Sequence, residues 1–132
     1  MKTLFLSLAA LASVTGCGST GENTVVVSDR GTLVVDWTID GAKDGGECRQ
    51  GAATTLDVTV QTADGGDVGE FQADCGSFAT SIDLPAGSYV ATAVLIDDAG
   101  NDRTTPIDID PFRIHGSDEL TTPIDFPADS FL

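Results

Sequence analysis

Apolar and polar residues alternate with a period of two along several segments of the chain, which is the pattern of strands with one buried face. In the clearest segment, 32–40, one face carries Leu33, Val35, Trp37 and Ile39, while the other face is mostly polar. Further segments with this pattern are 56–61, 71–73, 78–84, 107–110 and 121–126.

The stretch 87–97 is largely apolar on both faces, which predicts a central strand. Gly- and Asp-rich runs at 63–67 and 98–102 predict turns, and 41–51 is expected to be a loop. A proline cannot donate a ladder hydrogen bond. We therefore expect Pro111 to interrupt the sixth strand and Pro123 to place the last strand at an edge.

No apolar stripe with a helical period follows the first residues, and the strand segments recur about every ten residues. This spacing predicts an all-β fold, a single antiparallel β-sandwich of about seven strands over 32–132. A short edge strand at 25–27 is a further expectation.

The first residues carry an export signal. Lys2 precedes an apolar run, 4–12, which is too short to cross about 30 Å of hydrocarbon as a helix. A single basic residue before such a run is typical of a signal peptide.

The run ends in Val14-Thr15-Gly16-Cys17, which resembles the lipobox of bacterial lipoproteins. The resemblance implies that residues 1–16 are a signal peptide, that Cys17 receives a diacylglyceryl group, and that the new amino terminus is acylated. The alternative is an ordinary signal peptide with a coincidental cysteine. Two or three acyl chains would anchor the protein stably, since each buried methylene contributes about 0.8 kcal/mol.

Residues 17–31 are expected to form a lipidated, flexible tether with a reach of about 20 Å. Gly18 follows the lipobox cysteine, where an Asp would resemble the inner-membrane retention signal of Gram-negative lipoproteins. The expected location is therefore the outer membrane of the cell envelope, on its extracytoplasmic side.

Two cysteines remain if Cys17 is lipidated, and Cys48 and Cys75 are then an even pair in an oxidising compartment. We expect a disulfide between them, which would stabilise the fold by about 3 to 4 kcal/mol. A zinc site would need further ligands, and His115 is the only histidine.

The segment Leu84-Pro85-Ala86-Gly87-Ser88-Tyr89-Val90-Ala91 resembles the turn and strand of transthyretin-like and carboxypeptidase-regulatory-like sandwiches. It also resembles the tyrosine corner of immunoglobulin-like domains, which implies a bond from the Tyr89 hydroxyl to the preceding turn. The immunoglobulin pattern fails at Ala91, where a cysteine would stand, and at Trp37, which precedes Cys48. Over 31–126 the layout is similar to small lipoproteins of Gram-negative, myxobacteria-like bacteria.

The chain has 21 acidic and 6 basic residues, a net charge of -15 and a pI near 4.1. Such a field repels phosphate backbones, which disfavours nucleic acid as a partner. The acidity has two interpretations, solubility in a salty medium or a role that depends on a cation.

No common nucleophile, zinc or phosphate motif occurs, and the sequence implies no cofactor and no catalytic residue. A triad would have to use His115, which is expected to lie in a solvated loop. Calcium is the metal worth weighing, because Asp97, Asp98, Asn101 and Asp102 crowd one turn. Their spacing does not fit an EF-hand, and plain turns favour the same residues. Asp64 and Asp67 are the weaker calcium candidates.

The sequence as a whole predicts a lipid-anchored, non-catalytic accessory or interaction module of the cell envelope. Its partners would be the membrane, through the anchor, and an unidentified envelope protein or glycan. The alternatives are a Ca²⁺-stabilised adhesion or carbohydrate-binding module and a hydrolase without a recognisable motif.

Overall fold

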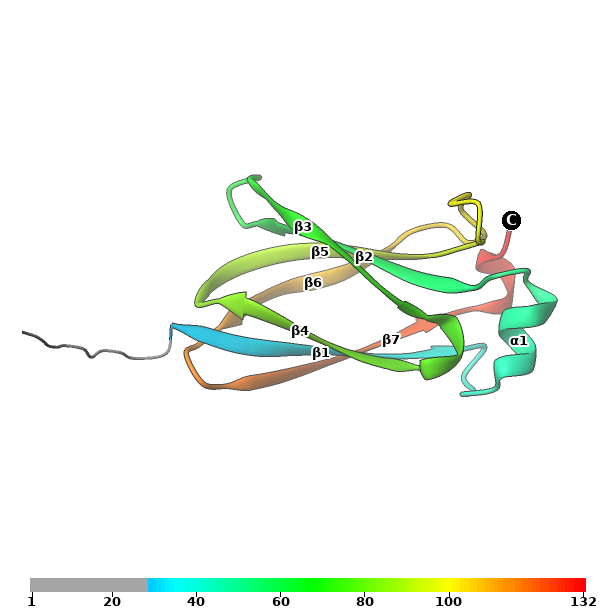
Figure 1. The fold of residues 1–132 in the computed structure, drawn as a ribbon, viewed down its shortest axis with the longest axis horizontal. Helices are drawn as coiled ribbons and strands as arrows, with labels where there is room; N and C mark the ends of the chain where they lie inside the picture. The colour runs from blue at the N-terminus through cyan, green and yellow to red at the C-terminus, as the bar shows by residue number, and fades with distance from the viewer. Residues whose placement is uncertain (1–28) are drawn as a thin grey trace, which may run out of the picture.

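The structure is a computed structural model that describes residues 29–132. Two sheets pack face to face, one with strand order β4-β1-β7 and one with order β3-β2-β5-β6 (Figure 1). The elements are β1 Arg30–Ile39, α1 Gly45–Gln50, β2 Thr55–Thr62, β3 Asp67–Asp74, β4 Ala79–Pro85, β5 Gly87–Ile96, β6 Ile107–Ile114 and β7 Glu119–Phe126. The predicted all-β sandwich is confirmed.

The predicted signal peptide, the lipobox with Cys17 and the strand expected at 25–27 lie outside the described residues. The sandwich itself begins slightly before the predicted boundary, because β1 starts at Arg30.

The core lies between the two sheets and is built from the alternating residues. In β1, Leu33, Val35 and Trp37 are fully buried, and the residues between them are only partly covered. In β5 the predicted face with Tyr89 and Leu95 is likewise inside. Because side chains alternate along a strand, this burial turns the intervening residues outward.

All strand pairs within 29–132 are antiparallel except β1 and β7, which are parallel. Both strands begin at the end of the sandwich where the chain enters and run toward the far end (Figure 1). Among residues 29–132, β7 pairs only with β1 and lies at a sheet edge, which confirms the position predicted from Pro123.

The expected break at Pro111 is wrong, because β6 continues to Ile114. The register between β5 and β6 shifts between Tyr89 and Ala91, so that Asp110 and Pro111 together lie opposite Val90. This β-bulge accommodates the proline, since a bulged residue need not donate a ladder hydrogen bond.

The segment expected to be only a loop, 41–51, contains the helix α1. The carboxylate of Asp44 caps it by accepting a 2.9 Å bond from the Gly46 backbone N–H. Six residues are too few to show an apolar repeat, so the sequence pattern did not reveal this helix.

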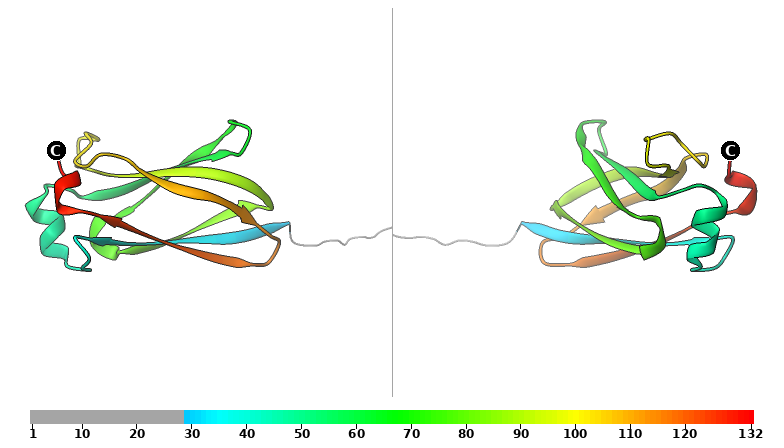
Figure 2. Two further views of the ribbon diagram at one scale, coloured as in Figure 1. Left: turned by 180° about the vertical axis from the view of Figure 1, so that it is seen from behind. Right: turned by 45° about the vertical axis from the view of Figure 1, so that its right-hand side comes forward.

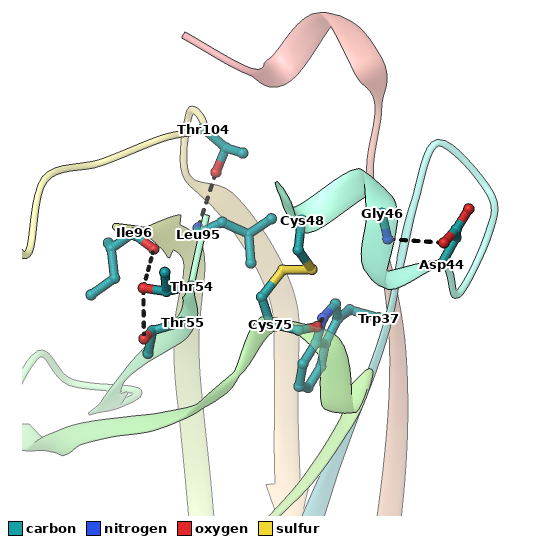
Figure 3. Close-up of a disulfide and its surroundings, with 10 residues drawn as sticks. All are labelled: Trp37, Asp44, Gly46, Cys48, Thr54, Thr55, Cys75, Leu95, Ile96 and Thr104. Atoms are coloured by element: carbon teal, nitrogen blue, oxygen red, sulfur yellow. Dashed lines mark hydrogen bonds between the residues drawn. A yellow bond between two sulfur atoms is a disulfide. The ribbon is translucent and has the colours of Figure 1, made fainter. Parts of the chain in front are cut away.

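A disulfide joins two of the connections that pass from one sheet to the other (Figure 3). Cys48 lies in α1, between β1 and β2, and Cys75 lies in the 3₁₀ turn between β3 and β4. The predicted pairing is confirmed. The Trp37 indole N–H donates a 3.0 Å bond to the Cys75 carbonyl, which fixes the same turn against β1.

The β4–β5 connection, at the opposite end, is held by Tyr89. Its hydroxyl donates a hydrogen bond to the Pro85 carbonyl, and its ring stacks on Phe112 with ring centroids 5.7 Å apart. This is the tyrosine corner expected from the sequence.

The β6–β7 connection packs directly on Gly31. A Cβ atom there would lie 2.5 Å from the His115 carbonyl oxygen and 2.9 Å from that of Asp118. Both are backbone atoms that cannot swing aside, so this position requires glycine.

The tyrosine corner predicts a clear difference between two substitutions. Tyr89→Ala removes the buried ring and its hydrogen bond and should lower the free energy of unfolding by about 3 to 5 kcal/mol. Tyr89→Phe removes the hydroxyl alone and should cost about 0.5 to 1.5 kcal/mol. Chemical denaturation measures both. Two variants that both lie within about 0.5 kcal/mol of the parent protein would show that Tyr89 does not support the fold.

Candidate functional site

The outer face of the four-stranded sheet carries a row of polar side chains that crosses all four strands. Glu70 on β3 lies opposite Thr59 on β2, Thr59 opposite Thr92 on β5, and Thr92 opposite Asp108 on β6. Directly opposed residues project from the same face of a sheet. The row therefore has a carboxylate at each edge and two hydroxyls in the middle.

The neighbouring row repeats this arrangement. Asp67 on β3 lies opposite Gln61, whose amide donates a 3.2 Å bond to the Asp67 carboxylate. Gln61 lies opposite Val90, and Val90 faces the bulge at Asp110 and Pro111. Acidic residues again occupy the two edge strands, with neutral residues between them.

A hollow of about 370 Å³ lies on this face. We call it the acid-bordered groove, and its lining includes Thr59, Gln61, Val90, Thr92, Asp108 and Pro111. The valine and proline give it an apolar floor, and the threonine hydroxyls and the glutamine amide offer hydrogen-bonding groups.

Asp57 lies beside the groove on the inner strand β2, opposite Gln72 and Val94. Its Oδ1 atom is buried and has no hydrogen-bond partner among residues 29–132. Burial raises the pKa of Asp57, and the nearby negative charges of Glu70 and Asp102 raise it further. Glu70 and Asp102 therefore both repel the ionised Asp57 carboxylate.

One basic residue shares the face with the groove. Arg113 lies at the end of the sheet opposite Ser88 and donates a 3.0 Å bond to the Ser88 hydroxyl. Other basic groups are engaged elsewhere: Lys43 forms a 2.7 Å ion pair with Asp36, and Arg103 donates to the Gly51 carbonyl.

In the turn considered for calcium, the first carboxylate, that of Asp97, is already engaged in hydrogen bonds within the turn itself. Asp97 accepts bonds from the backbone N–H groups of Asn101, at 2.9 Å, and Ala99, at 3.0 Å. These bonds lower the pKa of Asp97, and the bond from Asn101 has the largest effect. Across residues 29–132, no three acidic, histidine or cysteine side chains gather as a metal site would require.

The second acidic turn is similar, because Asp64 accepts a bond from the Thr62 hydroxyl. His115 is exposed in the β6–β7 turn, which confirms its predicted solvated position. Within the described part of the chain, no helix is both long and apolar enough to cross a membrane.

The alternation predicted for 56–61 puts Asp57 on the face opposite the apolar residues, but it does not reveal the groove. Glu70 and Asp108 are far apart in the chain, and only the order β3-β2-β5-β6 brings them onto one face. An alternating pattern assigns residues to a face but does not say which strands are neighbours.

No protein-family model matches the chain, and no curated protein matches it. Among solved structures, the Bacillus anthracis TIE protein is similar with a TM-score of 0.50 and 13% identity. The alignment covers 93% of this chain but only 19% of the TIE protein. This likeness shows the fold alone.

Two further structures, both from Bacteroides thetaiotaomicron, have lower scores. A leucine-rich repeat protein has a TM-score of 0.40 at 18% identity, covering 94% of this chain and 16% of that one. A DUF1812 protein, whose name proposes polysaccharide binding, has a TM-score of 0.38 at 10% identity. The alignment covers 70% of this chain and 46% of the DUF1812 protein. At these scores neither likeness carries an argument about function.

The raised pKa of Asp57 predicts that Asp57→Asn stabilises the protein at pH 7. The folded state disfavours the ionised Asp57 carboxylate, and this lowers the stability of the parent protein. The loss is fully present at a pH above the pKa of Asp57 in the folded state, and it is relieved as the pH falls through that pKa. The gain should be at most about 1 kcal/mol, because the group is partly exposed and solvent screens it. The gain should vanish at about pH 3, which lies below the pKa of Asp57 in both the folded and the unfolded state.

Chemical denaturation at both pH values measures this effect, with Asp98→Asn as a control that removes one charge from an exposed turn. A loss of stability at pH 7 in Asp57→Asn alone would show that the Asp57 carboxylate makes a favourable contact.

Proposed function

We propose that this protein is a lipid-anchored, non-catalytic binding module of a bacterial cell envelope. The observation that carries the proposal is where the chain enters the sandwich. β1 starts at Arg30, at one end of the long axis (Figure 2). In the sequence, the lipobox cysteine, Cys17, comes 13 positions before Arg30. A tether attached at that end leaves the broad outer faces of both sheets accessible.

The connections between the sheets support a role as a binding surface. The disulfide joins two of them at the far end, and the Tyr89 bond holds the β4–β5 connection at the near end. A surface that is already ordered loses less conformational entropy when it binds. The acid-bordered groove lies on a face whose shape is fixed in this way.

The aromatic residues support a protein partner over a glycan. Trp37 is fully buried and Tyr89 is 4% exposed, so neither ring can stack on a sugar. Among residues 29–132, the large hydrophobic side chain that stands exposed is Leu132. The rings of Trp37 and Tyr89 therefore offer a glycan no aromatic surface.

The anchor is tested by Cys17→Ser, which removes the sulfur that would carry the lipid. In the parent strain the protein should follow the detergent phase in a phase partition, and Cys17→Ser should move it to the aqueous phase. Mass spectrometry of the amino-terminal peptide should show acyl groups only where the cysteine is present.

Gly18→Ser is the matched control, because it places a serine beside the lipobox and keeps the thiol. That variant should remain in the detergent phase. A Cys17→Ser protein that partitions like the parent would overturn the anchor.

A further inference from the structure

We propose that the acid-bordered groove holds an extended, lysine- or arginine-bearing segment of a partner protein. This inference rests on the proposed function, because it names the partner class for the surface of the binding module. The shape of the groove and the charges around it support the inference.

The groove has room for a short extended segment. Its lining comes from β2, β5 and β6, and on β2 it extends from Thr59 to Gln61, two residue steps or about 7 Å. The neutral floor of Val90 and Pro111 can contact apolar side chains, and Thr59 and Thr92 can hydrogen-bond a backbone. A hollow of about 370 Å³ therefore accommodates a few residues of extended chain.

The charges lie on the two borders of the groove. Glu70 and Asp67 stand on β3, while Asp108 and Asp110 stand on β6. Three strand spacings separate the borders, about 14 Å. An extended segment directs alternate side chains to opposite sides. Basic side chains at two consecutive positions could thus reach opposite borders from a backbone that lies over the floor.

Asp57 adds a local reason for a cationic group. Its buried Oδ1 lacks a hydrogen-bond donor among residues 29–132, and Glu70 carries the same charge nearby. A lysine ammonium beside the Asp57 carboxylate would carry a positive charge and would offset this repulsion.

The same charges disfavour other occupants. A second copy of this chain also carries a net charge of -15 and would be repelled. Anionic lipid headgroups and nucleic acids are excluded by the same argument. The rings of Trp37 and Tyr89 are buried, so neither ring can stack on a glycan.

The test is titration calorimetry on the purified full chain in detergent micelles. The probe is a short synthetic peptide in which a pair of consecutive lysines is flanked by valines, and the control peptide has glutamate in place of each lysine. We expect the lysine peptide to bind, to weaken as salt is added, and to protect the backbone amides of β2 and β5 from hydrogen exchange. The glutamate peptide should not bind.

A matched pair of double variants separates the groove from the general acidity of the domain. Glu70→Gln with Asp108→Asn removes one charge from each border, and should weaken binding about tenfold. Glu119→Gln with Asp129→Asn removes the same two charges from exposed positions on β7 and near the carboxyl terminus. This control should bind within about twofold of the parent.

Three outcomes would contradict the proposal that the groove binds a basic segment. These are no binding of the lysine peptide, equal weakening by both double variants, and no weakening by either of them. Equal weakening would identify diffuse attraction to an acidic protein. The measurement does not depend on membrane partition. A negative result in the peptide experiment therefore does not contradict the proposed lipid anchor. A negative result in the Cys17→Ser experiment likewise does not contradict the proposed binding in the groove.

Discussion

The bond from the Trp37 indole to the Cys75 carbonyl, beside the Cys48–Cys75 disulfide, is the constraint on which the rest of the fold depends. Trp37 belongs to one sheet, and Cys75 begins the connection that brings the chain back from the other. The disulfide spans 27 residues, which corresponds to about 3 to 4 kcal/mol of stabilisation in the chain-entropy account. If the turn moved, the buried indole N–H would lose its acceptor, at a cost of about 1 to 3 kcal/mol. The two sheets are thus held in one relative position at this end.

That fixed position determines what the outer face presents. With Leu56, Val58 and Val60 buried in the core, the residues between them on β2 must face outward. A slip of one residue would bury Asp57 and expose the apolar side chains. The polar rows across the four-stranded sheet therefore follow from the register of the core. The bulge at Pro111 adds a local adjustment, because it places two residues of β6 opposite Val90.

Local patterns in the sequence were sufficient for the approximate positions of the strands, the tyrosine corner and the disulfide, but not for the continuation of β6 through Pro111. Each of these depends on residues whose chemistry is specific, such as Tyr89 after a Pro-Ala-Gly turn or two cysteines in an oxidising compartment. The helix α1 was not predictable, because an Asp44 cap and a disulfide hold a segment with little helical propensity. The groove was not predictable either. It requires Glu70 and Asp108 to lie on one sheet face, which depends on strand order and not on any local repeat.

The acidic residues of this face do not all have the same explanation. Charges on the edge strands β3 and β6 protect a sheet from pairing with another chain, so Glu70 and Asp108 could be explained by solubility alone. Asp57 is different, because β2 is an inner strand with neighbours on both sides and needs no such protection. There the carboxylate is partly buried, has an unsatisfied oxygen and a raised pKa, and lies near two like charges. Such a residue lowers stability, and residues that do so without structural benefit are expected at functional sites. Asp57 is therefore the acidic residue of this face that edge protection does not explain.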